Sequence, residues 1–565
     1  MEKTQGTADI TQVSSRSEVG EVRVLRSLRT VTSKQAGEVN YINAKEAHDD
    51  RELLAEIGYK QELQRHFSTV QVFGVAFSIM GLLPSIASVL AIAYGGGTVS
   101  LVWGWLICGF FILLEGLAMS ELASAIPTSG GLYYYTYHYA PEKYKSLLSF
   151  IIGNSNSLAL ASGLCSILYG FAEEILSIVS ISKNGNFEIT NGKTYGVYAA
   201  GVFSCLAVTS VATVGVSKLQ TFSIVSNLLL IAFFLIVLPI GVAQSDFDFN
   251  DGSFIFGEWV NSTSWSDGWQ FMLTGLQPAA WTIAAFDACI HMSEEAKNAT
   301  KAVPVGIIGS ITTCWIIGFF ICIAIAACMG SSVDAIANSE TGAPMAQIIF
   351  NALGKKWTIA IMTLIAFCQF IMGCSILTAI SRQIWAFARD DGLPFSKFFK
   401  VVNSKLSSPL RATWFGAGVA LVIGLLCLIG GEASNALFSL GIAGNYLAWM
   451  VPNILRLTTG KDLFRRGAFY MGDFWSPIVN WTSIAFQAFI IIVIMFPVDP
   501  SALTAETMNY TCVICGGVWF GSLIYYIVYK HKQYHGPKSN LDDAEFEEAV
   551  GQDVIDQILS HQKSG

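Results

Sequence analysis

The chain has 565 residues, of which 53% are hydrophobic and 13% are charged, and its mean hydropathy is +0.52. Soluble domains carry about 25% charged residues, so this composition indicates an integral membrane protein and excludes an ordinary soluble globular protein. The net charge is −8 and the sequence has no basic stripe, so nucleic acid is not expected as a partner.

The two ends of the chain differ from its centre. Residues 1–66 precede the first long apolar run and predict a cytosolic N-terminal tail without a cleavable signal peptide. Within this tail, residues 1–45 are polar and typical of disorder, and residues 52–66 predict a short amphipathic helix leading into the membrane. Residues 531–565 predict an acidic cytosolic tail with an amphipathic helix over residues 541–560. Both tails are interpreted as solvated or regulatory, and cytosolic regulators are the partners that they could bind.

The segment 67–530 predicts a domain of twelve transmembrane helices, because it contains twelve apolar stretches of about 20 residues. They lie near residues 70–93, 99–120, 146–170, 195–215, 220–243, 270–291, 304–328, 357–385, 411–430, 435–455, 476–496 and 510–529. With the N-terminus inside, fourteen Lys and Arg residues fall in cytosolic loops and four in the opposite loops. Because positive loops face the cytosol, both termini are expected there.

The outer loop 244–269 contains the sequon Asn261-Ser-Thr263, which makes Asn261 a candidate glycosylation site. All twelve cysteines lie in or beside apolar stretches and are interpreted as small core residues rather than metal or redox ligands. No metal and no cofactor are expected.

Two of the predicted spans contain helix-breaking residues near the middle of the membrane. Gly81 and Pro84 interrupt the first span, and Gly275 and Pro278 interrupt the sixth. An isolated glycine or proline usually makes only a packed kink. Breaks five helices apart, however, are typical of transporters built from inverted five-helix repeats, which bind substrate between the half-helices. Half-helix N-termini attract a carboxylate and half-helix C-termini attract an ammonium group, which predicts a zwitterion or an amine as the substrate.

A carboxylate, Asp287, lies within the sixth span, where its burial is expected to cost about 2.5–3.5 kcal/mol on insertion scales. It could carry a coupling proton, bind the distal ammonium of a longer amine, or bond to a neighbouring helix. His291 follows one helical turn later and is expected to support Asp287 at the cytosolic mouth. Two ligands without a third nearby do not make a metal site, so none is expected. Glu294 and Glu295 are predicted to be solvated loop charges that pair with Lys297 or with arginines.

Three motifs carry a resemblance to a known family. They are ELASAIPTSGGLYYYTYHYAP at 121–141, WTIAAFDACIHMSEEAKNATKAVPVGI at 281–307 and SRQIWAFARDDGLPFSKFF at 381–399. In their order and spacing they resemble the amino acid–polyamine–organocation superfamily, in its fungal amino acid/choline transporter branch. The resemblance implies an all-α membrane fold like that of the leucine transporter. Such a fold has a 5+5 inverted repeat, two extra helices, and discontinuous helices 1 and 6.

The resemblance also implies a substrate site at the two breaks. Its members are Ile79, Met80, Gly81, Leu82 and Leu83 in the first span, and Trp281, Ala284, Ala285 and Phe286 in the sixth. The N–H groups of Leu82 and Leu83 would face a substrate carboxylate, and carbonyls of Ile79, Trp281 and Ala284 would face the amine. Phe286 would act as a gate. Asp287 matches an acidic position just beyond the gap, where water is expected to reach it.

The chain departs from several proton-coupled relatives in the fifth span, where Asn227 replaces a lysine. Because asparagine does not titrate, either Asp287 or Glu115 in the second span is expected to carry the proton instead. The alternative role for Glu115 is that it packs against a polar neighbour. Polar residues of the third span, Asn154 with its neighbours Ser155 and Asn156, and Gln369 of the eighth span are candidates for the substrate pathway.

The function implied by the resemblance is secondary active transport. A proton-coupled permease for GABA or a related small amino compound is expected, with a choline or polyamine (putrescine) permease as the alternative. A nutrient sensor that does not transport is the alternative of another class. No nucleophile–base pair is present, so an enzyme is not expected. Protons and membrane lipids are the other expected partners, and the plasma membrane and the vacuolar membrane of a fungus both remain open.

Overall fold

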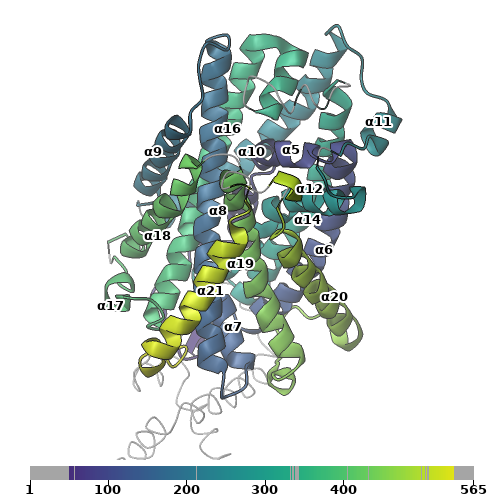
Figure 1. The fold of residues 1–565 in the computed structure, drawn as a ribbon. Coiled ribbons are helices and arrows are strands. Elements are labelled where there is room, and N and C mark those ends of the chain that lie inside the picture. The colour runs from purple at the N-terminus through teal and green to yellow at the C-terminus, as the bar shows by residue number, and fades with distance from the viewer. Residues whose placement is uncertain are drawn as a thin grey trace, which may run out of the picture.

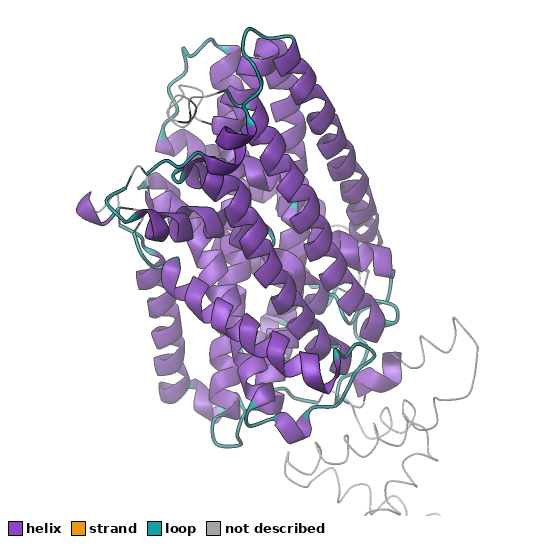
Figure 2. Cartoon of the chain, turned by 90° about the vertical axis from the view of Figure 1, so that its right-hand side faces the viewer, coloured by secondary structure: helices purple, strands orange, loops and turns teal. Residues whose placement is uncertain are grey.

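The computed structural model of the chain describes residues 50–55, 57–210, 213–261, 263–330, 333, 336, 343–403, 405–406, 408–429, 432–497, 499–502, 504 and 508–539. The predicted tails at 1–45 and 541–560 lie outside the described residues. Within that part of the chain every regular element is a helix, as Figure 2 shows, and pairing between extended segments is limited to two isolated bridges.

The helices form one bundle of long, steeply inclined elements (Figure 1). The membrane-sized and shorter α-helices are α4 (Thr69–Met80), α5 (Leu82–Tyr94), α6 (Gly97–Ala125), α7 (Gly131–Tyr139), α8 (Lys145–Ser182), α9 (Asn191–Thr209), α10 (Thr213–Ala243), α11 (Gly252–Gly257), α12 (Asp267–Thr282), α13 (Ala288–His291), α14 (Ala299–Cys328), α16 (Pro344–Arg389), α17 (Ser396–Phe399), α18 (Leu410–Ile423), α19 (Glu432–Leu457), α20 (Gly472–Val493) and α21 (Thr511–Val528). Short 3-10 helices are η2 (Ala284–Asp287), η3 (Gly424–Leu428), η4 (Lys461–Leu463), η5 (Pro500–Ala502) and η6 (Lys530–Lys532).

Nine segments in the described part of the chain are long and apolar enough to cross a membrane, which supports a multi-pass membrane protein. The other three predicted spans, 195–215, 270–291 and 435–455, coincide with α9, with α12, η2 and α13, and with α19. These segments are shorter, interrupted or richer in polar residues than the nine. The exact number of twelve crossings and the inverted repeat therefore stay predictions.

Both predicted helix breaks are present. Gly81 separates α4 from α5 and has the left-handed backbone angles φ +35° and ψ +63°, which glycine adopts at no steric cost. In the sixth span, α12 ends at Thr282 and the chain continues as the 3-10 turn η2 and the single turn α13. Pro278 lies inside α12, so the break comes one turn after the proline rather than at it.

The two longest helices, α8 and α16, run through the centre of the bundle and pack against each other (Figure 1). α8 also packs against α19, and α6 packs against α12 and α14. This arrangement surrounds the interrupted helices with protein. Their unpaired backbone groups are therefore shielded from lipid, as a broken helix in a membrane requires.

The helix predicted over residues 52–66 is wrong. The described helical residues of this segment are 50–55, Gly58 has φ +90°, and residues 57–66 form no helix. The Phe67 N–H donates to the Glu295 carbonyl at 3.0 Å, and the Lys297 N–H donates to the Phe67 carbonyl at 2.9 Å. These bonds replace helical ones, because Gly58 turns the chain along the loop that follows α13.

Candidate functional site

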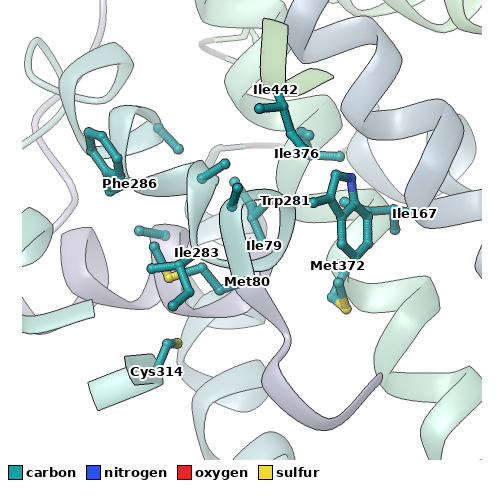
Figure 3. Packing of buried hydrophobic residues seen from close by; sticks show 14 of the residues in the cluster. Ile79, Met80, Ile167, Trp281, Ile283, Phe286, Cys314, Met372, Ile376 and Ile442 are labelled. Carbon is teal, nitrogen blue, oxygen red and sulfur yellow. The ribbon is translucent and has the colours of Figure 1, made fainter. Parts of the chain in front are cut away.

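A cavity of about 40 Å³ lies between the two helix breaks and the central helices α8, α16 and α19. Five predicted site residues line it, namely Ile79, Trp281, Ala284, Ala285 and Asp287. Figure 3 shows the apolar side chains around the breaks, with Trp281 and Ile167 beside each other. One ordered water needs about 10–15 Å³, so the cavity has room for only a few waters and is closed down around the break.

The other predicted substrate residues lie outside the cavity wall. Met80, Gly81, Leu82 and Leu83 are buried at the first break, just behind Ile79. Leu82 and Leu83 begin α5, and the first N–H groups of a helix have no partner within it. The N–H groups of Leu82 and Leu83 are therefore available as hydrogen-bond donors at the start of α5.

The predicted gate, Phe286, is fully buried against Trp449, with ring centroids 4.4 Å apart. The two pathway candidates bond to nearby backbone rather than line the cavity. Asn154 Nδ2 donates to the Phe150 carbonyl at 2.8 Å. Gln369 Nε2 donates to the Ile167 carbonyl at 2.9 Å, and since Ile167 lines the cavity, Gln369 supports its wall from behind.

Asp287 is the only carboxylate among the described residues that line this cavity. Its Oδ2 accepts hydrogen bonds from Asn156 Nδ2 at 3.1 Å and from Trp449 Nε1 at 3.2 Å. Its Oδ1 has no hydrogen-bond partner, and the side chain is fully buried. The expectation that water reaches Asp287 is therefore wrong for this conformation, because α8 and α19 enclose the carboxylate. One free oxygen remains for a proton or an ammonium group.

His291 lies where its spacing predicts, one turn after Asp287 on the same face. Its Nε2 is 3.8 Å from Asp287 Oδ2, which is too far for a hydrogen bond but close enough for charge interaction. Its Nδ1 is 3.2 Å from the Ser129 carbonyl. Since a carbonyl only accepts, Nδ1 donates this hydrogen bond, and Nε2 faces Asp287 without a hydrogen-bond partner.

Asn156 belongs to the polar run that was predicted to line the pathway, whereas Trp449, the second partner of this carboxylate, and Asn445, a partner of Asn156, were not predicted. Asn156 Nδ2 also lies 3.2 Å from Asn445 Oδ1, which links α8 to α19 beside the cavity. The sequence feature that pointed to Asn156 is the polar run of the third span, because at helical spacing at least one of its residues had to face a neighbouring helix. Asn445 and Trp449 are one turn apart in α19, and only the packing of α19 on α8 places them here.

The two remaining coupling candidates are also buried. Neither oxygen of Glu115 has a hydrogen-bond partner, and Glu115 lies close enough to Asp287 for their charges to interact. Asn227 Nδ2 donates to the Ser223 carbonyl at 3.0 Å, within its own helix α10. Asn227 therefore uses its amide for a hydrogen bond within α10. Glu115, in contrast, is a second carboxyl near Asp287 that has no hydrogen-bond partner.

Gly81 is in contact with α16 at the first break. A Cβ atom built on Gly81 would overlap Met372 Sδ, so the side chain of Met372 fills the space beside the Gly81 backbone. The backbone comes close to another helix here, and the left-handed φ of Gly81 adds a second reason for glycine.

We expect Gly81→Ala to reduce transport at least tenfold and to lower the thermal midpoint of the purified protein. Left-handed backbone costs a non-glycine residue about 1–2 kcal/mol, and overpacking adds about 1–3 kcal/mol. The matched control is Gly516→Ala in α21, where an added Cβ meets no atom within 4 Å. Transport by Gly81→Ala equal to that of the Gly516→Ala control would show that the break does not need glycine.

The prediction that Glu294 and Glu295 are solvated is wrong, whereas the predicted pairing with arginines is confirmed. Glu294 accepts hydrogen bonds from both terminal nitrogens of Arg389 at 2.9 and 3.1 Å, and Glu295 accepts from Arg382 Nε at 2.7 Å. Both carboxylates are fully buried. The two ion pairs join the segment that follows α13 to α16.

Asp390, at the end of α16, connects three parts of the chain. Its Oδ2 accepts hydrogen bonds from Tyr59 Oη at 2.8 Å and from Tyr133 Oη of α7 at 2.7 Å. Its Oδ1 accepts from the backbone N–H of Lys538 at 3.1 Å. Burial raises the pKa of the Asp390 carboxyl to about 6, against the lowering effects of the Arg389 charge and of these hydrogen bonds.

This raised pKa predicts that Asp390 contributes a pH-dependent stability. A carboxyl with a folded-state pKa above its unfolded value of 3.8 favours the folded state most below that unfolded value. The contribution is then lost as the pH rises through about 6. We expect the thermal midpoint of Asp390→Asn to fall less than that of the unchanged protein between pH 4 and pH 6. Parallel midpoint curves for the two proteins over this range would contradict the assignment.

Asn261 is exposed, and its Nδ2 donates to Asp267 Oδ1 at 2.8 Å, so the candidate glycosylation site lies on the surface of the 244–269 loop. Among the described residues no group of three His, Cys, Asp or Glu side chains is placed to hold a metal ion. Cys512 is exposed and the other eleven cysteines are buried, and all twelve are free thiols.

The sequence model of the amino acid permease family matches residues 67–519, which include every helix around the cavity. The chain belongs to the amino acid permease family. The permease is 58% identical over 539 residues to the GABA-specific permease of Saccharomyces cerevisiae, covering 95% of the chain and 94% of that relative. It is 34% identical over 505 residues to an uncharacterised amino-acid permease of Schizosaccharomyces pombe, covering 88% and 90% of the two chains. It is 29% identical over 507 residues to a putative polyamine transporter of Candida albicans, covering 87% and 90%. The permease is thus a transporter and not an enzyme.

Proposed function

We propose that the permease transports GABA or a closely related small amino compound, coupled to protons, through the cavity between its two broken helices. The observation that carries this proposal is one buried carboxylate, Asp287, with a free oxygen at a cavity that two helix breaks enclose. The similarity to a GABA-specific permease supports GABA over choline and putrescine.

The chemistry of the breaks suits a zwitterion. The start of α5 supplies the N–H groups of Leu82 and Leu83 to a carboxylate. The carbonyls at the end of α12 and at η2, those of Trp281 and Ala284, accept from an ammonium group at the other end. A cavity of about 40 Å³ does not hold GABA, so its apolar walls must move apart when the substrate binds.

Coupling to protons requires a group that titrates at this site. Asp287 has one unpaired oxygen, and Glu115 is a second buried carboxyl whose charge interacts with it. A proton bound by either carboxyl would remove the repulsion between their two charges, which makes this pair the place proposed for the coupling proton. Binding of the substrate ammonium near Asp287 would change which carboxyl holds it, and this links substrate to proton.

Uptake of radiolabelled GABA by the purified permease in sealed liposomes tests this function. With the interior alkaline, we expect GABA to accumulate and to be displaced better by unlabelled GABA than by choline, putrescine or α-amino acids. Better displacement by choline or putrescine would assign the permease to that substrate class instead. GABA that binds without accumulating would favour the nutrient sensor.

We further propose that both termini face the cytosol, in the plasma membrane or the vacuolar membrane of a fungus. The Lys and Arg distribution supports this orientation. A glycosylation acceptor engineered into loop 244–269 is expected to be modified, whereas tags at the two termini are expected to be accessible only from the cytosol. Glycosylation of an acceptor placed in the N-terminal tail instead would show that the permease has the opposite orientation.

A further inference from the structure

An open groove of about 580 Å³ lies at the end of the bundle near α17, away from the substrate cavity. Its wall includes three lysines, Lys397, Lys530 and Lys538, and one carboxylate, Asp391. Figure 1 shows α17 beside the lower end of α18, on the side where α21 also ends. The groove therefore lies at the level where membrane-spanning helices leave the bilayer.

The groove is positively charged because its carboxylate does not balance its lysines. Lys538 Nζ pairs with Asp391 Oδ2 at 2.8 Å. Lys530 Nζ donates to the carbonyls of Asp391 and Leu393 at 2.8 and 3.0 Å, which orients its ammonium without neutralising it. Lys397 is exposed and makes no ion pair with any residue that the structure describes. Each ammonium has three donors, so the groove keeps donors for an anion.

Further cations lie next to the groove on the same connection. Exposed Lys400 and Lys405 follow Lys397 between α17 and α18, exposed Arg411 is in the first turn of α18, and exposed Lys532 belongs to η6. The Arg411 guanidinium lies 4.5 Å from the centre of the Phe398 ring, which holds it against the groove wall. A cluster of this size beside transmembrane helices is typical of sites for anionic lipid headgroups.

Apolar side chains project beside these charges. Phe395 is 82% exposed, Trp414 of α18 is 62% exposed, and Val528 at the end of α21 is 72% exposed. Phe398, which lines the groove, is 53% exposed. Exposed aromatic rings next to lysines match the boundary between headgroups and acyl chains, where both kinds of group are stabilised. A soluble acidic ligand would satisfy the lysines and leave these rings in water.

We propose that this groove binds the headgroup of an anionic phospholipid of the cytosolic leaflet, with the exposed Lys397 facing the phosphate, the buried Lys530 adding positive charge behind it, and Phe395 and Phe398 beside the acyl chains. The assignment to the cytosolic leaflet rests on the proposed orientation. The other candidate occupant is the acidic segment of this chain that begins at Asp542, just after Lys538. The exposed aromatic rim favours the lipid.

Native mass spectrometry of the full-length permease with added phosphatidylserine tests the proposal, with phosphatidylcholine as the neutral probe. We expect Lys397→Gln/Lys400→Gln to weaken phosphatidylserine binding about tenfold and to leave phosphatidylcholine binding unchanged. The matched control is Lys143→Gln/Lys356→Gln, which removes two exposed lysines outside the groove. Equal weakening in both variants, or none in the groove variant, would overturn the site. Because all these lysines are exposed, both variants should keep the thermal midpoint of the unchanged protein.

Two further arms identify the occupant. Inorganic phosphate at constant ionic strength should leave phosphatidylserine occupancy unchanged. Displacement of phosphatidylserine by phosphate would assign the groove to a soluble anion.

A full-length variant with Asp542, Asp543, Glu547 and Glu548 neutralised should bind phosphatidylserine as before. Several-fold stronger binding by that variant would assign the groove to the acidic segment and overturn the lipid proposal. Lipid binding is measured without substrate, so its failure would be distinct from failure of GABA transport.

Discussion

Asp287→Asn will abolish GABA accumulation driven by a pH gradient, while exchange of internal for external GABA at equal pH will change by no more than about threefold. Asparagine has the shape of aspartate and can still accept from Asn156 Nδ2 and Trp449 Nε1 through its carbonyl oxygen. The closed packing around the break is therefore kept. What is lost is the only carboxylate among the described cavity residues that can bind and release a proton.

The comparison between accumulation and exchange separates the three roles that Asp287 could have. If Asp287 bound the substrate ammonium, asparagine would weaken accumulation and exchange together. If it served only as a link between helices, asparagine would leave both intact. Glu115→Gln is the matched control, since it removes a second buried carboxyl of the same pair. Accumulation that persists in Asp287→Asn and disappears in Glu115→Gln would move the coupling proton to Glu115.

Arg389→Ala will destabilise the permease by about 3–5 kcal/mol, because it leaves the Glu294 carboxylate buried without its cation. Arg389 also lies 3.8 Å from the centre of the Tyr59 ring, so alanine removes a second contact at the same place. Thr128 Oγ1 and the Ser129 N–H donate to Glu294 but carry no charge, and Arg65, whose charge interacts with Glu294, makes no hydrogen bond to it in this structure.

The matched control for this prediction is Arg466→Ala, which breaks a pair with Asp473 whose side chains are 63% and 75% exposed. An exposed pair contributes about 0–1 kcal/mol, so the control should leave the thermal midpoint nearly unchanged. The double variant Glu294→Gln/Arg389→Gln should cost less than the two single changes together, because it removes both buried charges. A midpoint for Arg389→Ala equal to that of the control would contradict the role of the buried pair.

The sequence was sufficient to predict both helix breaks, because glycine and proline act on the backbone of their own segment. Gly81 takes the left-handed conformation that only glycine adopts freely, and the break in the sixth span follows Pro278 by one turn. The position of Asp287 beside the second break follows from the same local argument. Five of the predicted residues accordingly line the cavity.

Partners distant in the chain were not predictable from local sequence. Asn156 and Trp449 are 131 and 162 residues from Asp287, and nothing in their own segments indicates which carboxylate they contact. Glu294 and Glu295 lie in a run that looks like a solvated loop, yet arginines 95 and 87 residues away bury them. The helix predicted over 52–66 fails because Gly58 and pairing with Glu295 and Lys297 outweigh its amphipathic pattern.

Protection of a cysteine placed at Ala285 by GABA tests most directly whether substrate binds in this cavity. The measurement uses full-length protein with the exposed Cys512 replaced by serine, and compares Ala285→Cys with Ser253→Cys on the exposed outer loop. At a GABA concentration ten times its dissociation constant, reaction of Ala285→Cys with a thiol reagent should slow about tenfold, and that of Ser253→Cys should not change. Equal reaction rates for Ala285→Cys with and without GABA, in protein that still transports GABA, would place the substrate elsewhere.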